Sequence, residues 1–196
     1  MLFTCYFYKL SFSKINYKKI MNSGLPKYEK LYHEIKNEYD LLSDKYDFIP
    51  AEVIHQNMNH INNIFIINQG KKHNIREKSF VINDKGLIGV VLKTFNDISI
   101  VKTIDSANTN ISVEVDECYG TLKSIRGKLV IDDILKCPNV LLGDPVFTSK
   151  YNYSSSNIII GYITDIKSDK YYVTPTVNKF EVRYVGVIND NNWYFT

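Results

Sequence analysis

The chain has 196 residues, 44% of them hydrophobic and 23% charged, so it can bury a globular core without disulfides or metals. Its formal charge of +3 is unevenly placed: residues 1–30 hold six lysines and one acid, or +5, which leaves −2 for the remainder. The globular part therefore offers no electrostatic case for nucleic-acid binding.

Residues 1–25 form a basic, aromatic-rich segment without firm periodicity. Its longest apolar run, MLFTCYFY, has eight residues, against the roughly 20 that a bilayer span needs. The segment also lacks the order of charged, apolar and small residues that marks a signal peptide. Two interpretations stay open: it lies on a membrane surface, or it is a disordered end.

Residues 26–47 are expected to form one amphipathic helix, with Pro26 in its first turn and Pro50 just after its end. One stripe of side chains recurs at spacings of 4, 3, 4, 3 and 4, which is the seam of a heptad repeat: Tyr28, Tyr32, Ile35, Tyr39, Leu42 and Tyr46. The seam either pairs two chains as a short coiled coil or packs on the protein's own domain.

The rest of the chain predicts strands and no further helix. The expected strands are 51–56, 63–68, 79–83, 87–93, 97–104, 110–116, 119–124, 127–132, 145–149, 157–167, 169–177 and 180–188. Short turn sequences such as Asn-Asp-Lys-Gly and Arg-Gly separate them. About a dozen strands in this arrangement indicate antiparallel barrels or sandwiches.

The stretch KGLIG at residues 85–89 raises the question of a phosphate-binding loop. Such a loop needs a helix after its glycines, and here the strand-like VVLK follows. The glycines are better explained as structural: a three-residue hairpin turn with Gly86 in the left-handed conformation, and a sharp bend at Gly89. Turns or bends are expected at five glycines: Gly70, Gly86, Gly89, Gly143 and Gly161. No cofactor site is predicted.

No residues form a recognisable catalytic or metal-binding pattern. The four histidines show no metal-ligand spacing, and GDPVFTS, which resembles the nucleophile motif of trypsin-like proteases, has Pro145 at the nucleophile's position. The three cysteines, Cys5, Cys118 and Cys137, form no framework. Cys118 and Cys137 either pair in an oxidising compartment or serve as small buried hydrophobes. The chain is therefore not predicted to be an enzyme.

Several motifs, in a fixed order, resemble the MreC family of bacterial rod shape-determining proteins. The matching stretches are Ile49 to Ile54, Ile67 to Gly70, Asp84 to Val91, Thr103 to Asp105 with Ile111 to Val113, Gly120 to Leu122, Gly143 to Ser149, and Ile160 to Ile163. Together they extend over residues 27–188. Two features depart from the family: no membrane span is visible, and Lys150 to Ser156 replaces a Gly-rich loop.

The resemblance implies a mainly β fold: a short coiled-coil helix, then two small six-stranded antiparallel barrels with protease-like double-barrel topology and no active site. The domains are then expected at residues 1–25 (basic segment), 26–47 (helix), 48–115 (first barrel), 116–189 (second barrel) and 190–196 (tail).

The resemblance also implies a function, that of a non-enzymatic scaffold of the cell-wall elongation machinery that maintains cell shape. The implied partners are a second copy through the helix, MreD, a class B penicillin-binding protein, RodA and MreB, with no nucleic acid. The protein is expected at the cell membrane with its barrels on the extracytoplasmic side. The alternatives are a small basic nucleic-acid-binding barrel, suggested by the pI and the tyrosines, and an inactive protease-like double barrel with another binding role.

Overall fold

The computed structural model describes residues 46–58, 63–132, 139–150 and 157–189, together with His33, Lys36, Asn37, Tyr39, Asp40, Leu42 and Ile134. The chain divides into one unit that ends at Leu41 and a second unit from Leu42 to Thr196. All of the strands lie in the second unit. Within the described residues, no helix has the length and apolar content that a membrane span requires.

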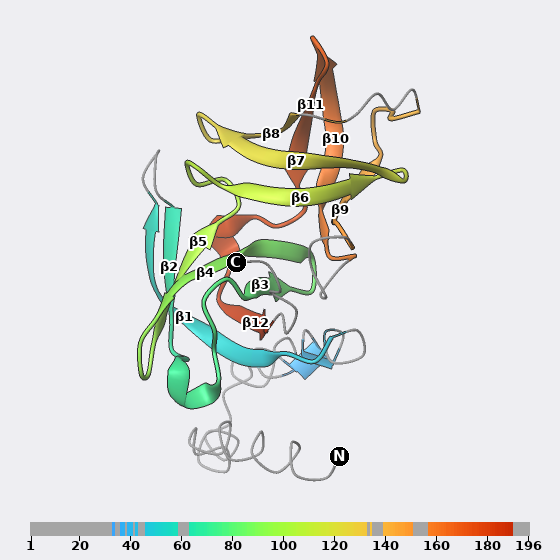
Figure 1. The fold of residues 1–196 in the computed structure, drawn as a ribbon. Coiled ribbons are helices and arrows are strands. Elements are labelled where there is room, and N and C mark those ends of the chain that lie inside the picture. The colour runs from blue at the N-terminus through green and yellow to red at the C-terminus, as the bar shows by residue number, and fades with distance from the viewer. Residues whose placement is uncertain are drawn as a thin grey trace. The chain divides into compact units, whose positions relative to one another are not determined.

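The first barrel closes six antiparallel strands in the order β1-β12-β3-β4-β5-β2 (Figure 1). The strands are β1 (Ile49–Met58), β2 (Asn63–Ile67), β3 (Phe80–Asn83), β4 (Gly86–Thr94), β5 (Ser99–Thr103) and β12 (Tyr184–Ile188). A short 3-10 helix, η1 (Lys71–His73), follows β2. Strand β12 completes this barrel from the far end of the chain, because it pairs with both β1 and β3.

The second barrel closes the other six strands in the order β10-β11-β8-β7-β6-β9. They are β6 (Asn110–Val115), β7 (Cys118–Ile125), β8 (Lys128–Asp132), β9 (Pro145–Thr148), β10 (Ile159–Lys167) and β11 (Lys170–Pro175). A second 3-10 helix, η2 (Lys179–Glu181), lies on the return from β11 to β12. The chain therefore crosses between the barrels twice, through residues 104–109 and 176–183.

The cores follow from side-chain alternation. In β2, NIFII, every second residue is buried, and Phe65 and Ile67 are fully buried inside the first barrel. Strand β6 alternates in the same way and sends Ile111 and Val113 into a cluster that fills the second barrel. Residues Phe80, Ile82 and Leu87 of the first barrel belong to that same cluster, so the core continues across the junction between the barrels.

Glycines allow close approach of neighbouring strands at two bends. A Cβ atom on Gly89 would lie 2.2 Å from the Lys102 carbonyl oxygen, and one on Gly161 would lie 2.1 Å from the Thr174 carbonyl oxygen. Both glycines lie in long, irregularly paired strands, β4 and β10, whose ladders shift register nearby. A side chain at either position would force two hydrogen-bonded strands apart.

The two-barrel fold is confirmed, and each of the twelve expected strands overlaps an observed one. The predicted barrel boundary between residues 115 and 116 is wrong, because β6 lies in the second barrel and β12, expected in the second, lies in the first. The return of β12 depends on pairing with strands more than 100 residues earlier, and no local pattern encodes such pairing.

The expected helix over 26–47 falls mostly outside the described residues. Those described between His33 and Leu42 have helical backbone, and the Tyr46 amide donates to the Leu42 carbonyl at 2.9 Å. Tyr46 itself lies beyond the helical residues. The coiled coil, the basic segment 1–25 and the tail 190–196 remain predictions.

Candidate functional site

The KGLIG stretch forms a tight hairpin between β3 and β4. Asn83 pairs with Gly86, so the loop contains only Asp84 and Lys85, one residue fewer than expected. The Asn83 side-chain oxygen accepts hydrogen bonds from the amides of Lys85, at 3.1 Å, and Gly86, at 3.2 Å. Gly86 has φ +141°, and a Cβ atom there would lie 2.4 Å from the Ile159 carbonyl oxygen. The loop's own side chain therefore occupies amides that a phosphate would need.

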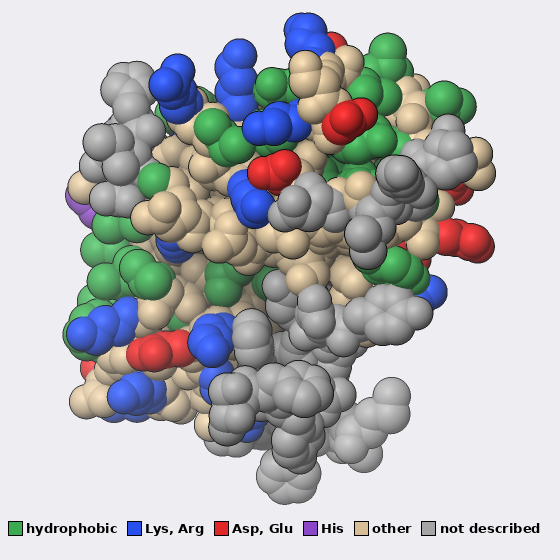
Figure 2. Space-filling model, turned by 45° about the horizontal axis from the view of Figure 1, so that its top comes forward, with side chains coloured by type: hydrophobic (Ala, Val, Ile, Leu, Met, Phe, Trp, Pro, Cys, Tyr) green, Lys and Arg blue, Asp and Glu red, His purple; other side chains and the backbone are tan. Residues whose placement is uncertain are grey.

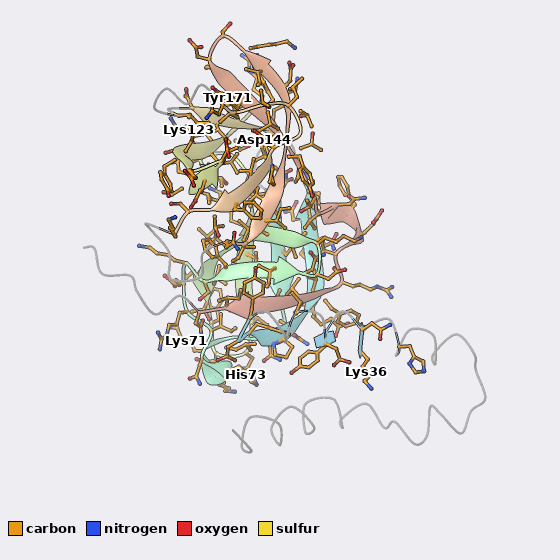
Figure 3. All side chains as sticks on the ribbon, turned by 90° about the vertical axis from the view of Figure 1, so that its right-hand side faces the viewer. Lys36, Lys71, His73, Lys123, Asp144 and Tyr171 are labelled. Carbon is orange, nitrogen blue, oxygen red and sulfur yellow. The ribbon has the colours of Figure 1, made fainter. Side chains whose placement is uncertain are left out.

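The remaining predicted turn glycines lie in loops. Gly143 has φ +92° with open space around it, so backbone conformation, not crowding, favours glycine there. Gly70 precedes η1, and a Cβ atom there would lie 2.3 Å from the Phe95 carbonyl oxygen. Figure 3 shows Lys71 and His73 on this same turn, with Asp144 of the Gly143 turn on the second barrel.

The protease-like stretch GDPVFTS carries no exposed nucleophile. Ser149 is buried, its amide donates to the Ser112 carbonyl at 3.0 Å, and Pro145 opens strand β9. In the part of the chain that the structure describes, no three His, Cys, Asp or Glu side chains are grouped to hold a metal ion. Two features of the described residues are candidates for a functional role: a polar cluster at the junction of the barrels and a set of exposed apolar side chains.

The polar cluster, which we call the clasp, centres on Asp105 in the first crossing between the barrels. Its carboxylate accepts hydrogen bonds from the Thr103 hydroxyl, at 2.5 Å, and from the side-chain amide of Asn63, at 3.0 Å; both residues lie in the first barrel. It also pairs with the ammonium of Lys179, in the second crossing. The Asp105 carbonyl accepts from the Ser124 hydroxyl of β7 at 2.6 Å. One residue thus joins both barrels and both crossings.

Burial makes these contacts matter energetically. The Asp105 side chain is 16% exposed and the Lys179 side chain 24% exposed. Burial alone would raise the pKa of Asp105, but hydrogen bonds from Lys179 and Thr103, the charge of Lys179 and the Asn63 amide together hold this pKa below its usual value. Asp105 is therefore ionised at neutral pH and keeps the lysine compensated.

Buried hydroxyl groups extend the clasp into the first barrel. The Ser106 hydroxyl donates to the backbone carbonyl of Asn63 at 2.7 Å and accepts from the backbone amide of Asn63 at 2.9 Å. The Thr103 hydroxyl lies 3.3 Å from that of Ser106, and neither residue is more than 1% exposed. The buried polar groups of this part of the crossing thus satisfy one another's hydrogen-bonding capacity, an arrangement that favours a single packing.

A groove of about 340 Å³ opens beside the clasp. Asp105 and Lys179 line it together with a majority of apolar residues, among them Leu87, Ile104 and Val177. Phe180 stands at its rim with 68% of its surface exposed, and the Lys179 ammonium lies 5.2 Å from the centre of its ring. The junction of the barrels is thus hollowed and partly apolar.

Among the residues that the structure describes, Leu141 and Leu142 are the most exposed aliphatic ones, at 64% and 65%, on the turn before β9. The Asp144 carboxylate accepts from the Leu141 amide at 2.7 Å, and Gly143 and Asp144 both bond to Ile163 of β10 through their backbones. Tyr162, 45% exposed, pairs with Pro145 in the adjoining ladder. We call Leu141, Leu142 and Tyr162 the apolar turn. Figure 2 shows hydrophobic side chains in small groups among charged ones on the described part of one face.

The predicted dimer seam is divided by the structure. Leu42 is 7% exposed within the core cluster of the barrels, and Tyr46 packs against that cluster. The Tyr46 hydroxyl donates to the Asn157 carbonyl at 3.3 Å, and burial raises its pKa. Tyr39 has helical backbone, whereas Tyr28, Tyr32 and Ile35 fall outside the described residues. The end of the seam therefore packs on the protein's own barrels.

The sequence alone did not predict the clasp or the apolar turn. Asp105 lies in a stretch that resembles a family motif, but nothing in the sequence marks Lys179, 74 residues later, as its partner. Leu141 and Leu142 are apolar residues of the kind that usually lies in a core. The only sequence signal for their exposure is the turn dipeptide Gly143-Asp144 that follows them.

The fold is a tandem β-barrel. Its two notable features within the described residues are the clasp, which joins the barrels, and the apolar turn, which is exposed. The family model of rod shape-determining protein MreC, barrel core, matches residues 53–189, which is more than half of the chain. The chain belongs to the MreC family of structural, cell shape-determining proteins. No curated protein matches it in sequence.

Solved structures show the same fold at low sequence identity. The major periplasmic domain of the cell shape-determining filament MreC is 20% identical, with a TM-score of 0.65 over 72% of this chain and 96% of that one. MreC from Pseudomonas aeruginosa is 16% identical, with a TM-score of 0.66 over 73% and 99%. A chain from the complex of PBP2 and MreC of Helicobacter pylori is 13% identical, with a TM-score of 0.58 over 73% and 98%.

Proposed function

We propose that this cell-shape scaffold binds a class B penicillin-binding protein through its barrels and thereby holds a cell-wall synthase in the elongation machinery. The observation that carries this is the Helicobacter pylori complex of PBP2 with MreC, because the matched chain is covered over 98% of its length by this fold. Almost the whole of a relative that forms a complex with a penicillin-binding protein therefore shares its fold with this chain.

The apolar turn is the surface best suited to that contact. Binding energy at interfaces concentrates in a few apolar or aromatic side chains that are already held in place. Leu141 and Leu142 are exposed, but Leu141 is hydrogen-bonded to Asp144, and the turn is fixed to Ile163 through Gly143 and Asp144, so docking costs little additional ordering of the backbone. Tyr162 adds an aromatic ring on the neighbouring strand. A partner with an apolar surface would bury all three.

The test is direct binding of the full chain to the extracytoplasmic domain of a class B penicillin-binding protein from the same organism, measured by biolayer interferometry. Truncating Leu141 and Leu142 to serine should weaken binding at least about tenfold, the size expected for central anchors. Leu92→Ser is the matched control, because Leu92 is 55% exposed on the first barrel.

The outcomes separate two claims. Failure of the folded wild-type chain to bind at tens of micromolar would contradict the proposed partner. Equal binding by the wild type and the double serine variant would keep the partner and reject the apolar turn.

Further parts of the proposal concern assembly and location. Two copies pair through the part of the seam before Leu42, namely Tyr28, Tyr32, Ile35 and Tyr39, because Leu42 and Tyr46 already contact the barrels. The basic segment 1–25 associates with the membrane, with the barrels on the extracytoplasmic side. MreD, RodA and MreB are the remaining partners, and their support is the family resemblance.

A further inference from the structure

We propose that one end of the first barrel binds an anionic phospholipid surface through five basic side chains and one exposed aromatic ring. Four of the basic residues lie on η1 and the segment after it, and the fifth lies near the end of β4. We call this set, with the aromatic residue that follows β4, the basic loop: Lys71, Lys72, Arg76, Lys78, Lys93 and Phe95. All six residues are exposed, and Figure 3 shows Lys71 among them.

Backbone hydrogen bonds hold both ends of the η1 segment against β4 and its turn. The Lys71 amide donates to the Phe95 carbonyl at 2.7 Å, and the Lys78 amide donates to the Val91 carbonyl at 2.7 Å. The basic residues of the segment therefore lie beside Lys93 and Phe95, although more than a dozen residues of chain separate the two groups.

Further contacts fix the middle of the segment. The Asn189 side chain donates to the Asn74 carbonyl at 2.7 Å and accepts from the Arg76 amide at 3.3 Å. Ile75 is 2% exposed and belongs to the core cluster of the first barrel. Because the backbone is already held in place, binding through this surface costs little additional ordering of the backbone.

The charge of this end differs in sign from that of the rest of the domain. Residues 71–78 and 92–98 hold five basic and two acidic residues, or +3, whereas residues 31–196 as a whole carry −2, which leaves −5 for the remainder. One of the two acids, Asp97, pairs with Lys72 at 2.7 Å. An anionic surface attracts the basic loop and repels the rest, which favours one orientation of the barrel.

Phe95 favours a lipid surface over a soluble polyanion. Phe95 is 43% exposed, and the Lys93 ammonium lies 5.3 Å from the centre of its ring. An aromatic ring beside lysines suits the boundary between headgroups and acyl chains, where the ring leaves water while the ammonium groups meet phosphates. A soluble polyanion would use the charges alone and leave the ring in water.

Lipid contact by the basic loop rests on the proposed location of the barrels beside a membrane, but not on the proposed penicillin-binding partner. The basic loop belongs to the first barrel and the apolar turn to the second, so the two contacts use different residues. A chain that binds the penicillin-binding protein but no vesicle would keep the proposed partner and lose the lipid contact.

Tryptophan fluorescence at position 95 tests the contact directly. The full chain carries Phe95→Trp with its native Trp193 replaced by Phe, and it is titrated with vesicles of phosphatidylglycerol or of phosphatidylcholine. We expect a blue shift of the emission, and quenching by brominated acyl chains, with phosphatidylglycerol only. Phe180→Trp in the same background is the matched control, because Phe180 is exposed outside the basic loop, and it should show neither change.

Removal of charge gives a second measurement, the partition of the full chain onto phosphatidylglycerol vesicles in cosedimentation. Each basic side chain near an anionic surface contributes about fivefold, and the basic segment 1–25, which is unchanged, retains part of the binding. We therefore expect a loss of about 10–100-fold in the triple variant Lys71→Gln, Lys72→Gln, Lys93→Gln.

The matched control removes the same charge from the second barrel, in the variant Arg126→Gln, Lys128→Gln, Lys167→Gln. Each set takes one lysine from an exposed ion pair, Lys72 in one and Lys167 in the other. The control should weaken partition less than about threefold, because charges more than about 10 Å from the lipid are largely screened.

Three results would overturn the lipid contact. The first is the absence of a blue shift at position 95, or an equal shift with phosphatidylcholine. The second is an equal loss of partition in the two triple variants. The third is binding of soluble poly(glycerol phosphate) without quenching at position 95 by brominated lipid, which would reassign the basic loop to a soluble polyanion.

Discussion

Replacing Asp105 by alanine should reveal how strongly the clasp holds the barrels. The substitution leaves the Lys179 ammonium, 24% exposed, without its carboxylate, and it removes the acceptor of Thr103 and Asn63. Breaking a fully buried ion pair costs about 3–5 kcal/mol, and the residual exposure here lowers the expectation to about 2–4 kcal/mol. Urea denaturation monitored by far-ultraviolet circular dichroism measures this change in the free energy of unfolding.

A matched control separates the clasp from ion pairs in general. Lys72 and Asp97 also form an ion pair, at 2.7 Å, but their side chains are 62% and 64% exposed. Asp97→Ala should therefore cost no more than about 0.5 kcal/mol. In a double-mutant cycle, Asp105→Ala and Lys179→Met should couple by about 1–3 kcal/mol. An Asp105→Ala variant within about 0.5 kcal/mol of the control would refute the assignment of the clasp.

The clasp also predicts a pH dependence. The folded-state pKa of Asp105 lies below its usual value, so the ionised carboxylate stabilises the folded protein. This contribution is complete above the usual carboxyl range near about pH 4, and it is lost as the pH falls through the lower folded value. Asp105→Asn should be less stable at neutral pH, and its stability should fall less steeply under acid. Parallel curves for both proteins would contradict the ionised clasp.

The remaining predictions concern close packing and the seam. Gly161→Ala should cost at least about 3 kcal/mol in a urea titration, because its Cβ would meet backbone 2.1 Å away. Gly127→Asn, in open space at φ +77°, should cost only about 1 kcal/mol, because asparagine tolerates positive φ better than most residues; equal effects would contradict the strand approach. Leu42→Ala should lower stability by about 2–4 kcal/mol because a core side chain is lost, and an unchanged midpoint would argue against its burial. Tyr32→Asp with Ile35→Asp should leave the melt unchanged but abolish concentration-dependent association in sedimentation, and a wild-type chain monomeric up to about millimolar would contradict pairing.

The strands were predictable because their signals are local. Alternation in NIFII and the turn residues around each strand determine β2 and its neighbours without reference to the rest of the chain. Gly89 and Gly161 were recognisable as bends because glycine inside a strand is otherwise unfavourable. The six-strand closure of each barrel came from resemblance to a family, since alternation alone is equally compatible with sandwiches.

The boundary between the barrels and the clasp were not predictable for the same physical reason. Both depend on contacts between segments far apart in the chain: β12 with β1, and Lys179 with Asp105. Leu42 shows a related limit, because a heptad stripe indicates which face is apolar but not whether that face meets a second chain or its own barrel. Sequence periodicity identifies surfaces that must be covered, and only the fold identifies what covers them.

Cell shape is the most direct measure of the central claim that this double barrel is a shape-determining scaffold. The protein is depleted in the organism that encodes it, and the ratio of cell length to width is followed by microscopy, with re-expression of wild type or of the Asp97→Ala control. We predict that the ratio falls towards that of a sphere on depletion and is restored by both proteins. Cells that keep their ratio and continue to grow after complete depletion would contradict the account.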